Sequence, residues 1–361
     1  MTRPVRARID LSALQHNYRV AQKLHGGRAL AVLKANAYGH GAVPCAHALE
    51  GMADGFAVAF LDEALALRQA GIASPILVLE GVFDAEELHA ASINDLWVVV
   101  HQEAQLHWME QLQATSKPMH VWLKVDTGMH RAGIAPEQVA QAYERLQRCR
   151  QVQELVLMSH FARADEPHES ATERQMAVFE SVTAGMQADK SICNSAGVMA
   201  WPKARLEWAR PGIMLYGASP LPAALDNSPM LKPVMELSSQ VFAERWLSPG
   251  EALGYGGNYV AHRPTRVGLV AIGYADGYPR SVSAGTPVCI DGRDSHIIGR
   301  VSMDMLTVDL THLSHAGIGS QVELWGSRVS VNTVAGHAGT IAYELLCNVK
   351  RVPLEYLACS V

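Results

Sequence analysis

The sequence of 361 residues lacks several features that would define its class at once. It contains no run of 18 or more apolar residues, and its first ten residues include no hydrophobic stretch, so we expect neither a membrane span nor a secretory signal. Its six cysteines include no C-x-x-C pair, which argues against a zinc ribbon and predicts no metal site. Scattered cysteines are typical of free thiols in a reducing compartment, and we therefore expect a cytoplasmic protein.

The sequence also has no excess of positive charge. Lys and Arg number 30 against 35 Asp and Glu, for a net charge of -5, which argues against a nucleic-acid partner. Hydrophobic residues make up 49% of the chain and charged residues 18%, values typical of a globular protein with a large core. At roughly 100–200 residues per domain, the length predicts two domains.

Short apolar runs alternate with longer amphipathic stretches from about residue 10 to residue 216. The first stretch is a predicted helix with Asp10 as its N-cap and Gly26 as its stop. Later helix-like segments include Asp62–Ala70, Pro136–Cys149 and Glu169–Ala188. The runs predict eight buried parallel strands, at Ala29–Leu33, Phe56–Phe60, Ile76–Leu79, Leu96–Val100, His120–Val125, Leu155–Met158, Ser191–Cys193 and Leu206–Trp208. No G-x-G-x-x-G turn follows any of them, so a (β/α)8 barrel (TIM barrel) is favoured over an open doubly wound sheet.

The pattern changes after about residue 229. Short segments rich in Val and Ile are separated by Gly, Pro and Asp, which predicts a mostly β domain: Thr265–Ile272, Pro287–Ile290, Ser295–Val301, Leu306–Asp309 and Gln321–Trp325. Within it, Asn332–His337 and Tyr343–Cys347 are the segments with a helical pattern. The proline-rich stretch Ser219–Pro229 is the predicted linker. We therefore expect a barrel over residues 1–228 and a β domain over 229–361, with the first ~10 residues as a candidate strand of the second domain.

Polar side chains gather where the predicted barrel strands end. The C-terminal ends of barrel strands carry the chemistry of this fold. Five of these ends supply Lys34 with Tyr38, Lys124 with Arg131, His160, Ser195, and Arg210 with Gly212 and Ile213. We therefore expect these groups to meet at one rim of the barrel.

Two of these groups point to a phosphorylated aldehyde. Ser195 and the backbone N–H groups of Gly212 and Ile213 follow the last two strands, where barrels commonly bind phosphate, although a Pro-Gly pair is also found in ordinary turns. Lys34 ends the first strand, where it is either a solvated surface lysine or an amine that forms a Schiff base. A lysine and a phosphate site on one rim suggest pyridoxal 5′-phosphate (PLP).

Several longer motifs resemble the alanine racemase family, and they cover essentially the whole chain in the family's order. In the first half they are VLKANAYGHG (32–41), KVDTGMHRAG (124–133), MSHFA (158–162), NSA (194–196) and RPGIMLYG (210–217). In the second half they are LGYG (253–256), IGYADGYPR (272–280), GRVSMD (299–304) and TIAYE (340–344). The resemblance is strongest to the proteobacterial enzymes, including the catabolic type.

The resemblance implies a role for each matching residue. Lys34 would carry PLP as a Schiff base and act on one face of the substrate, while Tyr255, from the β domain of a partner subunit, would act on the other. The phosphate would be held by Tyr38, Ser195, Gly212, Ile213 and Tyr343. Arg210 would face the pyridine nitrogen, and His160 would lie between Arg210 and Tyr255. The substrate would be oriented by Arg131 and the Met303 N–H, and Lys124 would match a lysine that is often carbamylated.

The implied activity is interconversion of L-alanine and D-alanine by a homodimer with two catalytic bases, in D-alanine supply for peptidoglycan or in alanine catabolism. Three alternatives stay open at this point. A related PLP-dependent decarboxylase is disfavoured because those enzymes are longer and place an acid where Arg210 stands. A non-catalytic PLP-binding protein is disfavoured because such proteins lack the β domain. A racemase of broader specificity is the third.

Overall fold

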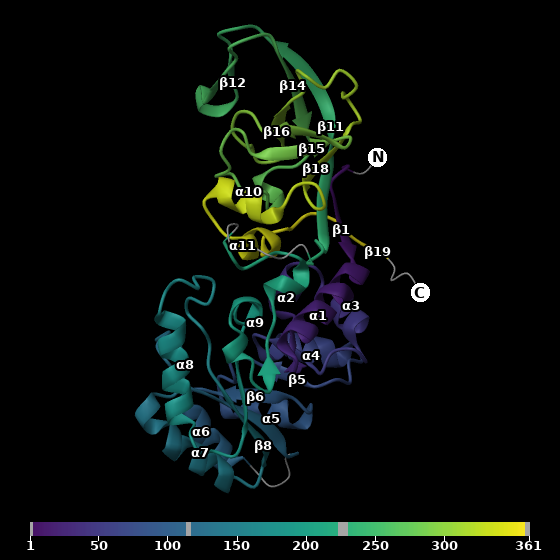
Figure 1. Ribbon diagram of the computed structural model, residues 1–361. Coiled ribbons are helices and arrows are strands. Elements are labelled where there is room, and N and C mark those ends of the chain that lie inside the picture. The colour runs from purple at the N-terminus through teal and green to yellow at the C-terminus, as the bar shows by residue number, and fades with distance from the viewer. Residues whose placement is uncertain (1–2, 113–116, 223–229, 358–361) are drawn as a thin grey trace.

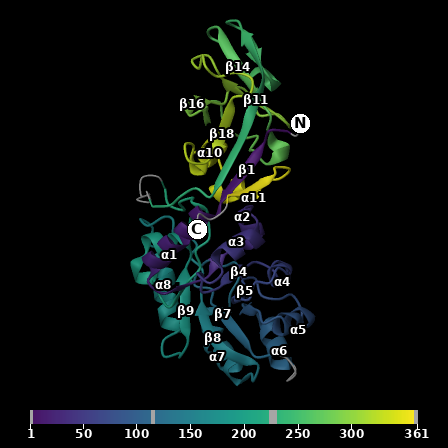
Figure 2. The same cartoon turned by 90° about the vertical axis from the view of Figure 1, so that its right-hand side faces the viewer.

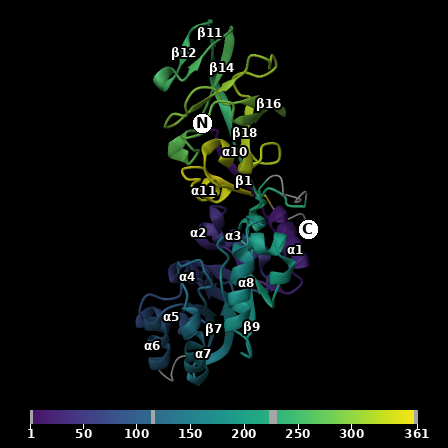
Figure 3. The same ribbon diagram turned by 60° about the vertical axis from the view of Figure 1, so that its left-hand side comes forward.

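The computed structural model describes residues 3–112, 117–222 and 230–357. Two lobes follow one another along the long direction of the molecule, and the helix α11 (Ala342–Cys347) lies where they meet, next to α2 (Lys34–Tyr38) (Figure 1). Two rotated views show the same division, with the strands β11 and β14 in the lobe opposite the barrel (Figures 2 and 3). The molecule is therefore built from a barrel lobe and a β-rich lobe.

The parallel strands of the first lobe close into a barrel. Their order in the sheet is β2-β10-β9-β8-β7-β6-β5-β4-β3, and each pair is parallel. β2 and β3 are two halves of one extended segment interrupted at Leu30, so pairing on both of its sides closes the ring. The bounds are Arg28–Ala29, Ala31–Val32, Phe56–Val58, Ile76–Val78, Trp97–Val100, Met119–Lys124, Val152–Met158, Asp189–Cys193 and Trp208–Ala209 for β2 to β10. The predicted (β/α)8 barrel is confirmed.

Helices surround this barrel. They are α1 (Leu11–His25), α3 (Ala42–Leu49), α4 (Leu61–Gln69), α5 (Ala85–Ile93), α6 (Glu103–Gln111), α7 (Val139–Arg148), α8 (Ala171–Val182) and the short α9 (Ser195–Ala200). The Asp10 carboxylate accepts from the N–H groups of Ser12 and Ala13, and Gly26 ends α1 in the left-handed conformation, as the sequence predicts. α8 is shorter at both ends than the predicted Glu169–Ala188. No helix among the described residues is both long and apolar enough to cross a membrane.

The second lobe contains an eight-stranded sheet. Its strands are β1 (Arg6–Asp10), β11 (Met235–Leu247), β14 (Thr265–Val270), β15 (Pro287–Ile290), β16 (Arg293–His296), β17 (Leu306–Asp309), β18 (Gln321–Trp325) and β19 (Leu354–Leu357). The long strand β11 pairs with β1, β14 and β18, all antiparallel. It was not among the predicted strands, because polar residues such as Ser238, Ser239 and Gln240 interrupt its apolar pattern. The predicted mostly β character of this lobe is confirmed.

Three further features complete the second lobe. The helices α10 (Val331–Ala338) and α11 match the two predicted helical segments to within a residue at either end. A two-stranded ribbon, β12 (Ala252–Leu253) with β13 (Tyr259–Val260), lies at the end of the lobe far from the barrel (Figure 1). β1 pairs with β11 and with β19 before the chain enters the barrel at α1, so the first described residues belong to the second sheet. The predicted linker and the domain division at 228 lie largely outside the described residues.

Candidate active site

The barrel mouth begins with an unusual turn directly after β3. Lys34 follows this strand, and Ala35 to Tyr38 have φ values between 52° and 54°, so α2 is a left-handed turn built from residues other than glycine. Each such residue costs roughly 1–2 kcal/mol, so the surroundings must stabilise the turn. The Glu63 carboxylate on α4 accepts from Ala35 N at 2.6 Å and from Ala59 N at 2.8 Å. An acidic side chain thus holds the backbone that carries Lys34.

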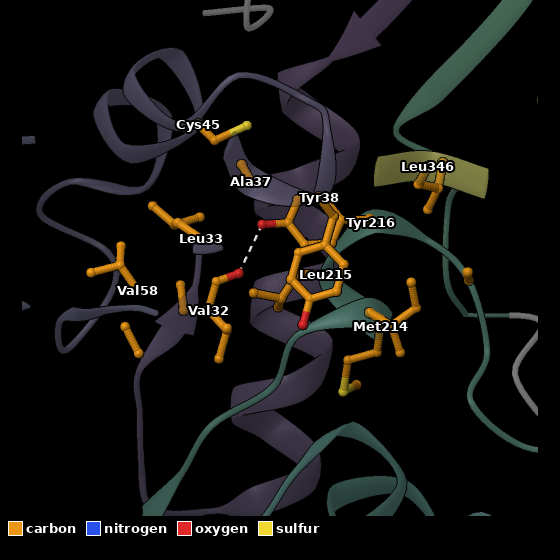
Figure 4. Packing of buried hydrophobic residues seen from close by; sticks show 14 of the residues in the cluster. Val32, Leu33, Ala37, Tyr38, Cys45, Val58, Met214, Leu215, Tyr216 and Leu346 are labelled. Atoms are coloured by element: carbon orange, nitrogen blue, oxygen red, sulfur yellow. Dashed lines mark hydrogen bonds between the residues drawn. The ribbon is translucent and has the colours of Figure 1, made fainter. Parts of the chain in front are cut away.

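Aromatic packing also supports this turn. The Tyr38 and Tyr216 rings lie 4.7 Å apart, and the Tyr216 hydroxyl donates to the Val32 carbonyl at 2.8 Å (Figure 4). His40 packs on Tyr216 at 4.6 Å, and its Nδ1 lies 2.9 Å from the Tyr38 carbonyl. Tyr38, His40 and Tyr216 are nearly or fully buried. The position of Lys34 is therefore set by a packed scaffold.

A cavity of about 360 Å³ opens at this mouth. It brings together ten of the residues named from the sequence, from five strand ends and from α11: Lys34, Tyr38, Lys124, Arg131, His160, Ser195, Arg210, Gly212, Ile213 and Tyr343. Val32, Leu79 and Met158 supply apolar walls, and Glu80, Asn194 and Cys347 complete the lining with Ala35. Five cationic or imidazole groups share this space with one carboxylate, so the cavity is suited to an anionic ligand.

One end of the cavity is a cradle of small groups and backbone N–H donors. Ser195 begins α9, and its hydroxyl accepts from Gly212 N at 2.9 Å and Met214 N at 3.3 Å. A Cβ atom at position 212 would lie 2.4 Å from the Tyr38 hydroxyl, so the sequence needs glycine there for space. A helix start, hydroxyls and backbone N–H groups at the last two strands are the donor set that binds phosphate in barrels.

Arg210 is the most deeply buried charge of the cavity. It is 4% exposed; Nη1 donates to the Ser191 hydroxyl, and Nη2 donates to the Ser159 carbonyl at 2.6 Å. Burial lowers the pKa of Arg210 to about 10, so it remains a cation at neutral pH. Among the described residues no carboxylate forms an ion pair with it. A buried unpaired cation requires neutral polar partners, and the two serines supply them.

His160 and Lys124 share the electrostatic environment of Arg210. Burial, followed by the nearby charges of Arg210 and Lys124, lowers the pKa of His160 well below its ordinary value, so His160 is neutral at pH 7. Burial also lowers the pKa of Lys124, and Glu80 opposes this shift while Arg210 and Arg131 add to it. The structure therefore offers a neutral imidazole and a lysine that loses its proton more readily than usual.

Two residues named from the sequence lie outside this cavity. Tyr255 is in the ribbon region between β12 and β13, and it is 69% exposed. Met303 is 53% exposed, in the loop before β17. Because the β12–β13 ribbon lies at the far end of the second lobe (Figures 1 and 3), Tyr255 does not meet Lys34 within one chain.

Several polar residues around the cavity were not identified from the sequence. Glu63 holds the left-handed turn, and Ser191 and Ser159 contact Arg210. Gln175 donates to the Thr127 hydroxyl and to the His160 carbonyl. Ser159 and Thr127 stand inside quoted motifs, so their positions gave a signal. Glu63 and Gln175 lie in predicted helices and Ser191 lies in a predicted strand, but all three stand outside the quoted motifs. Their roles depend on contacts between elements that are distant in the chain.

Together the fold and the cavity define a class of protein: a barrel whose mouth holds a lysine and a phosphate-sized cradle, joined to a β domain. Comparison with known families gives the particular group. Residues 9–220 match the family model "Alanine racemase, N-terminal domain", and residues 234–356 match "Alanine racemase, C-terminal domain". The chain belongs to the alanine racemase family.

Individual relatives agree with this assignment. The chain is 60% identical to the alanine racemase of Azoarcus sp. (strain BH72), over 98% of this chain and 99% of the relative. It is 55% identical to a catabolic alanine racemase of Pseudomonas putida, with the same coverage. The structure is similar to the biosynthetic alanine racemase from Pseudomonas aeruginosa, with a TM-score of 0.95, 45% identity and coverage of 99% and 100%. It also resembles the alanine racemase from Bartonella henselae with covalently bound pyridoxal phosphate (TM-score 0.89, 29% identity, coverage of 99% and 100%).

Proposed function

We propose that this protein is an alanine racemase, an isomerase that interconverts L-alanine and D-alanine with PLP as its cofactor. The observation that carries the proposal is the cavity at the barrel mouth, which places Lys34, the Ser195–Gly212 cradle and the buried Arg210 around one space. Membership in the alanine racemase family supports the substrate, and the related structure with covalently bound pyridoxal phosphate supports the cofactor.

The residues present fit this cofactor. Ser195, Gly212 and Ile213, together with Tyr38 and Tyr343, would hold its phosphate, because the space at Gly212 exists only without a Cβ atom. Lys34 would hold the cofactor covalently through its aldehyde carbon. When bound, PLP supplies an electron sink that lowers the cost of removing the proton from the substrate Cα. The cavity would therefore bind both the phosphate and the aldehyde of PLP.

Racemisation requires proton transfer on both faces of the Cα atom. Lys34 would accept or donate the proton on one face, and Tyr255 would do so on the other. Arg131, which lines the cavity, and the backbone N–H of Met303 would orient the substrate carboxylate. His160, neutral beside Arg210, would lie between Arg210 and Tyr255. Lys124, with its lowered pKa, is suited to carbamylation and would position Arg131.

Arg210 would also influence which reaction follows. A guanidinium that is positively charged at neutral pH disfavours a proton on a pyridine nitrogen placed opposite it, whereas a carboxylate would favour one. Arg210 would thereby limit electron withdrawal by the ring and suppress transamination. If the Arg210→Glu variant still racemises alanine with the same frequency of side-product formation as the wild type, Arg210 does not have this role.

The distance between Tyr255 and the cavity leads to a second proposal, that the enzyme is a homodimer with shared active sites. Tyr255 is strongly exposed in the β12–β13 ribbon, at the end of the β-rich lobe far from the barrel, and Met303 is strongly exposed in the loop before β17. Neither residue lines the cavity that holds Lys34 of the same chain. The partner's β-rich lobe would place its own copies of these residues over the cavity. The division at residues 228 and 229, between the barrel and the lobe that supplies Tyr255, remains a prediction.

The test is a racemisation assay on the purified protein supplied with PLP, using L-alanine, L-serine and L-lysine in parallel and following loss of optical rotation. We expect alanine to be racemised most efficiently. Comparable kcat/KM values on lysine would contradict the alanine assignment and favour the broader racemase. Release of carbon dioxide would indicate a decarboxylase, and absence of proton exchange at Cα would indicate a non-catalytic protein.

The cellular role is proposed more broadly. D-alanine made by the enzyme would serve peptidoglycan synthesis, or the reverse reaction would serve alanine catabolism; the relatives include a biosynthetic and a catabolic enzyme. The expected compartment is the cytoplasm, and the five cysteines of the described ranges, all free thiols, are compatible with it. Growth of a strain lacking other racemases, with and without D-alanine, tests the biosynthetic role.

A further inference from the structure

We propose that Gln175 is a positioning residue that fixes Arg210 and His160 relative to each other through a buried chain of hydroxyl groups. Gln175 lies on α8 and is 3% exposed, although it does not line the cavity. The proposal rests on the proposed function, because it assigns Gln175 a part in the same active site. It concerns a residue whose sequence context gives no functional signal.

The Gln175 amide connects three separate segments. Its Oε1 accepts from Ala162 N at 2.9 Å, and its Nε2 donates to the His160 carbonyl at 3.0 Å and to the Thr127 hydroxyl at 3.1 Å. The first two bonds hold the backbone on both sides of Phe161, in the loop after β8. The third reaches the loop after β7, which continues to Arg131. One side chain therefore links α8 to the loops that carry two cavity residues.

The direction of each hydrogen bond among these hydroxyl groups follows from the single hydrogen atom that each hydroxyl carries. The Ser159 hydroxyl donates to the Val125 carbonyl at 2.9 Å, so its single hydrogen is used. The Thr127 hydroxyl, 2.7 Å from the Ser159 hydroxyl, must then be the donor in that pair, and its oxygen accepts from Gln175. The chain runs from Gln175 through Thr127 and Ser159 to Val125, with a donor and an acceptor in every contact. Such fully satisfied buried networks favour one arrangement.

Ser159, one member of this chain of hydroxyl groups, also holds Arg210. Ser159, 1% exposed, uses its own carbonyl to accept from Arg210 Nη2 at 2.6 Å. On the other side Arg210 Nη1 donates to Ser191, whose hydroxyl donates to the Trp208 carbonyl at 2.9 Å. The guanidinium is thus fixed between two serines, one of them anchored by Thr127 and Gln175. The Gln175 bond to the His160 carbonyl places the imidazole from the same anchor.

The proposal predicts a loss of catalysis without a loss of the fold. Gln175→Met keeps the length and volume of the side chain but removes the three hydrogen bonds. Thr127→Val removes the hydroxyl, and Thr127→Ser keeps it. Because small displacements of catalytic groups cost up to about 100-fold in rate, we expect kcat to fall about 10- to 100-fold in Gln175→Met and Thr127→Val, with KM changed much less. Thr127→Ser should retain wild-type kcat.

The control is Gln105→Met. Gln105 is also a buried glutamine, 1% exposed and on helix α6, and its amide lies within hydrogen-bonding distance of His101 N, the Val82 carbonyl and His101 Nε2. Among the described residues, it shares no hydrogen-bond partner with Gln175, Thr127 or Ser159. We expect this variant to lose thermal stability to a similar degree while keeping kcat within about twofold, because sites without shared partners act independently. An equal loss of kcat in Gln105→Met would mean that removing any buried amide has the same effect, and it would overturn the proposal.

A second readout does not depend on turnover. The absorbance of the PLP-loaded protein is titrated with pH in each variant, and retained PLP is measured after gel filtration. We expect a shifted titration midpoint in Gln175→Met and Thr127→Val, and wild-type midpoints in Thr127→Ser and Gln105→Met. Unchanged midpoint and kcat in Gln175→Met would overturn the proposal. A wild type that binds PLP but does not racemise alanine would refute the proposed function, while the midpoints would still decide the role of Gln175.

Discussion

At the scale of single residues, the cavity depends on a glycine that leaves space and on charged or titratable side chains that are unusually buried. Gly212 leaves the space into which the Tyr38 hydroxyl projects, and Arg210 remains charged with serine partners in place of an ion pair. His160 remains neutral in the field of the surrounding cations. These features depend on their surroundings, and a substitution at Gly212 tests the first of them directly. A substitution at the buried His40 tests how burial shifts a pKa at the same barrel mouth.

The first prediction concerns the cradle. In Gly212→Ala the new Cβ atom would lie 2.4 Å from the Tyr38 hydroxyl and 3.1 Å from its ring carbon, so the buried ring has to move. Overpacking of this kind costs typically about 1–3 kcal/mol, and we expect the affinity for PLP to fall about tenfold or more. Titration of the apoenzyme with PLP, followed by absorbance, measures this loss.

Two further variants make the test specific. Tyr38→Phe removes the closest contact, and it also removes a hydroxyl proposed to hold the phosphate. Gly212→Ala should therefore cost less PLP affinity when it is added to Tyr38→Phe than when it is added to the wild type. Gly336→Ala, in α10, adds a Cβ atom where no atom lies within 4 Å, and should leave PLP binding unchanged. If Gly212→Ala binds PLP as tightly as the wild type, the cradle at residue 212 does not hold the phosphate.

The second prediction concerns pH and stability. Burial lowers the pKa of His40 to about 4, while an unfolded histidine titrates near 6.5. The unfolded state therefore binds more protons between these values, and the free energy of unfolding falls as the pH falls below about 6.5. The His40 contribution at pH 5 is a loss of about 2 kcal/mol relative to pH 7.5.

Urea denaturation of the wild type and of His40→Gln, at pH 7.5 and pH 5, measures this contribution. The variant cannot titrate at this position, so its stability should fall less between the two pH values. His25 and His160, whose pKa values are also lowered, are present in both proteins and cancel in the comparison. Equal falls in the two proteins would show that His40 does not contribute.

At the scale of elements, the left-handed turn α2 is the feature that needs most support. It is held by Glu63 from α4, by the packing of Tyr38 on Tyr216 and by α11 from the other lobe. At Gly39, where the turn ends with φ 81°, a Cβ atom would lie 2.2 Å from the Leu346 carbonyl. Glycine is required there both for its backbone conformation and for the close approach of α11.

The third prediction removes one of these supports. Glu63→Ala removes the carboxylate acceptor of the Ala35 and Ala59 N–H groups, of which the first is exposed and the second partly buried, so we expect a loss of about 1–3 kcal/mol in total. We expect a lower melting temperature together with weaker PLP binding, because the backbone next to Lys34 loses its anchor. Differential scanning fluorimetry and PLP titration measure the two effects.

Glu87→Ala is the matched control for this prediction. The Glu87 carboxylate accepts from Phe83 N at 2.8 Å at the start of α5, in the same position relative to its helix, but it does not contact α2. It should lower stability and leave the PLP affinity unchanged. A Glu63→Ala variant that loses stability and binds PLP normally would limit Glu63 to a helix-capping role.

At the scale of the whole molecule, the two proposed catalytic residues lie in different lobes of the same chain. Lys34 lies in the barrel mouth, whereas Tyr255 is exposed at the far end of the β-rich lobe. A cyclic two-fold dimer brings the same pair of surfaces together twice, so each active site would take its lysine from one chain and its tyrosine from the other. This arrangement has a consequence that can be measured in mixed dimers.

The fourth prediction is complementation between two inactive variants. Lys34→Ala and Tyr255→Phe should each be inactive, but unfolding and refolding them together should restore about a quarter of the wild-type activity. Half of the dimers formed at random are mixed, and each mixed dimer contains one intact site of two. Absence of any recovered activity, with dimers verified by light scattering, would contradict a site shared between chains.

The amino-acid sequence by itself determined the elements and most of the chemistry. Alternation of apolar runs with amphipathic stretches predicted the barrel strands, and Asp10 and Gly26 marked the ends of the first helix, because these signals depend on a few neighbouring residues. The strand β11 is not predicted because polar residues interrupt its apolar pattern, and its burial depends on sheet neighbours, β1 and β18, that are distant in the chain. Local patterns predict elements well, and they do not predict strands whose apolar pattern is incomplete.

Tertiary structure alone decided how the site residues are held. Strand order implied that Lys34, His160 and Arg210 would share a rim, yet the burial that lowers the pKa values of His160 and Arg210 exists only in the closed barrel. The supporting residues Glu63 and Gln175 act across elements through hydrogen bonds of about 3 Å, a geometry that no spacing along the chain encodes. Sequence specifies which groups are present, and folding sets their distances, on which electrostatics and hydrogen bonding depend.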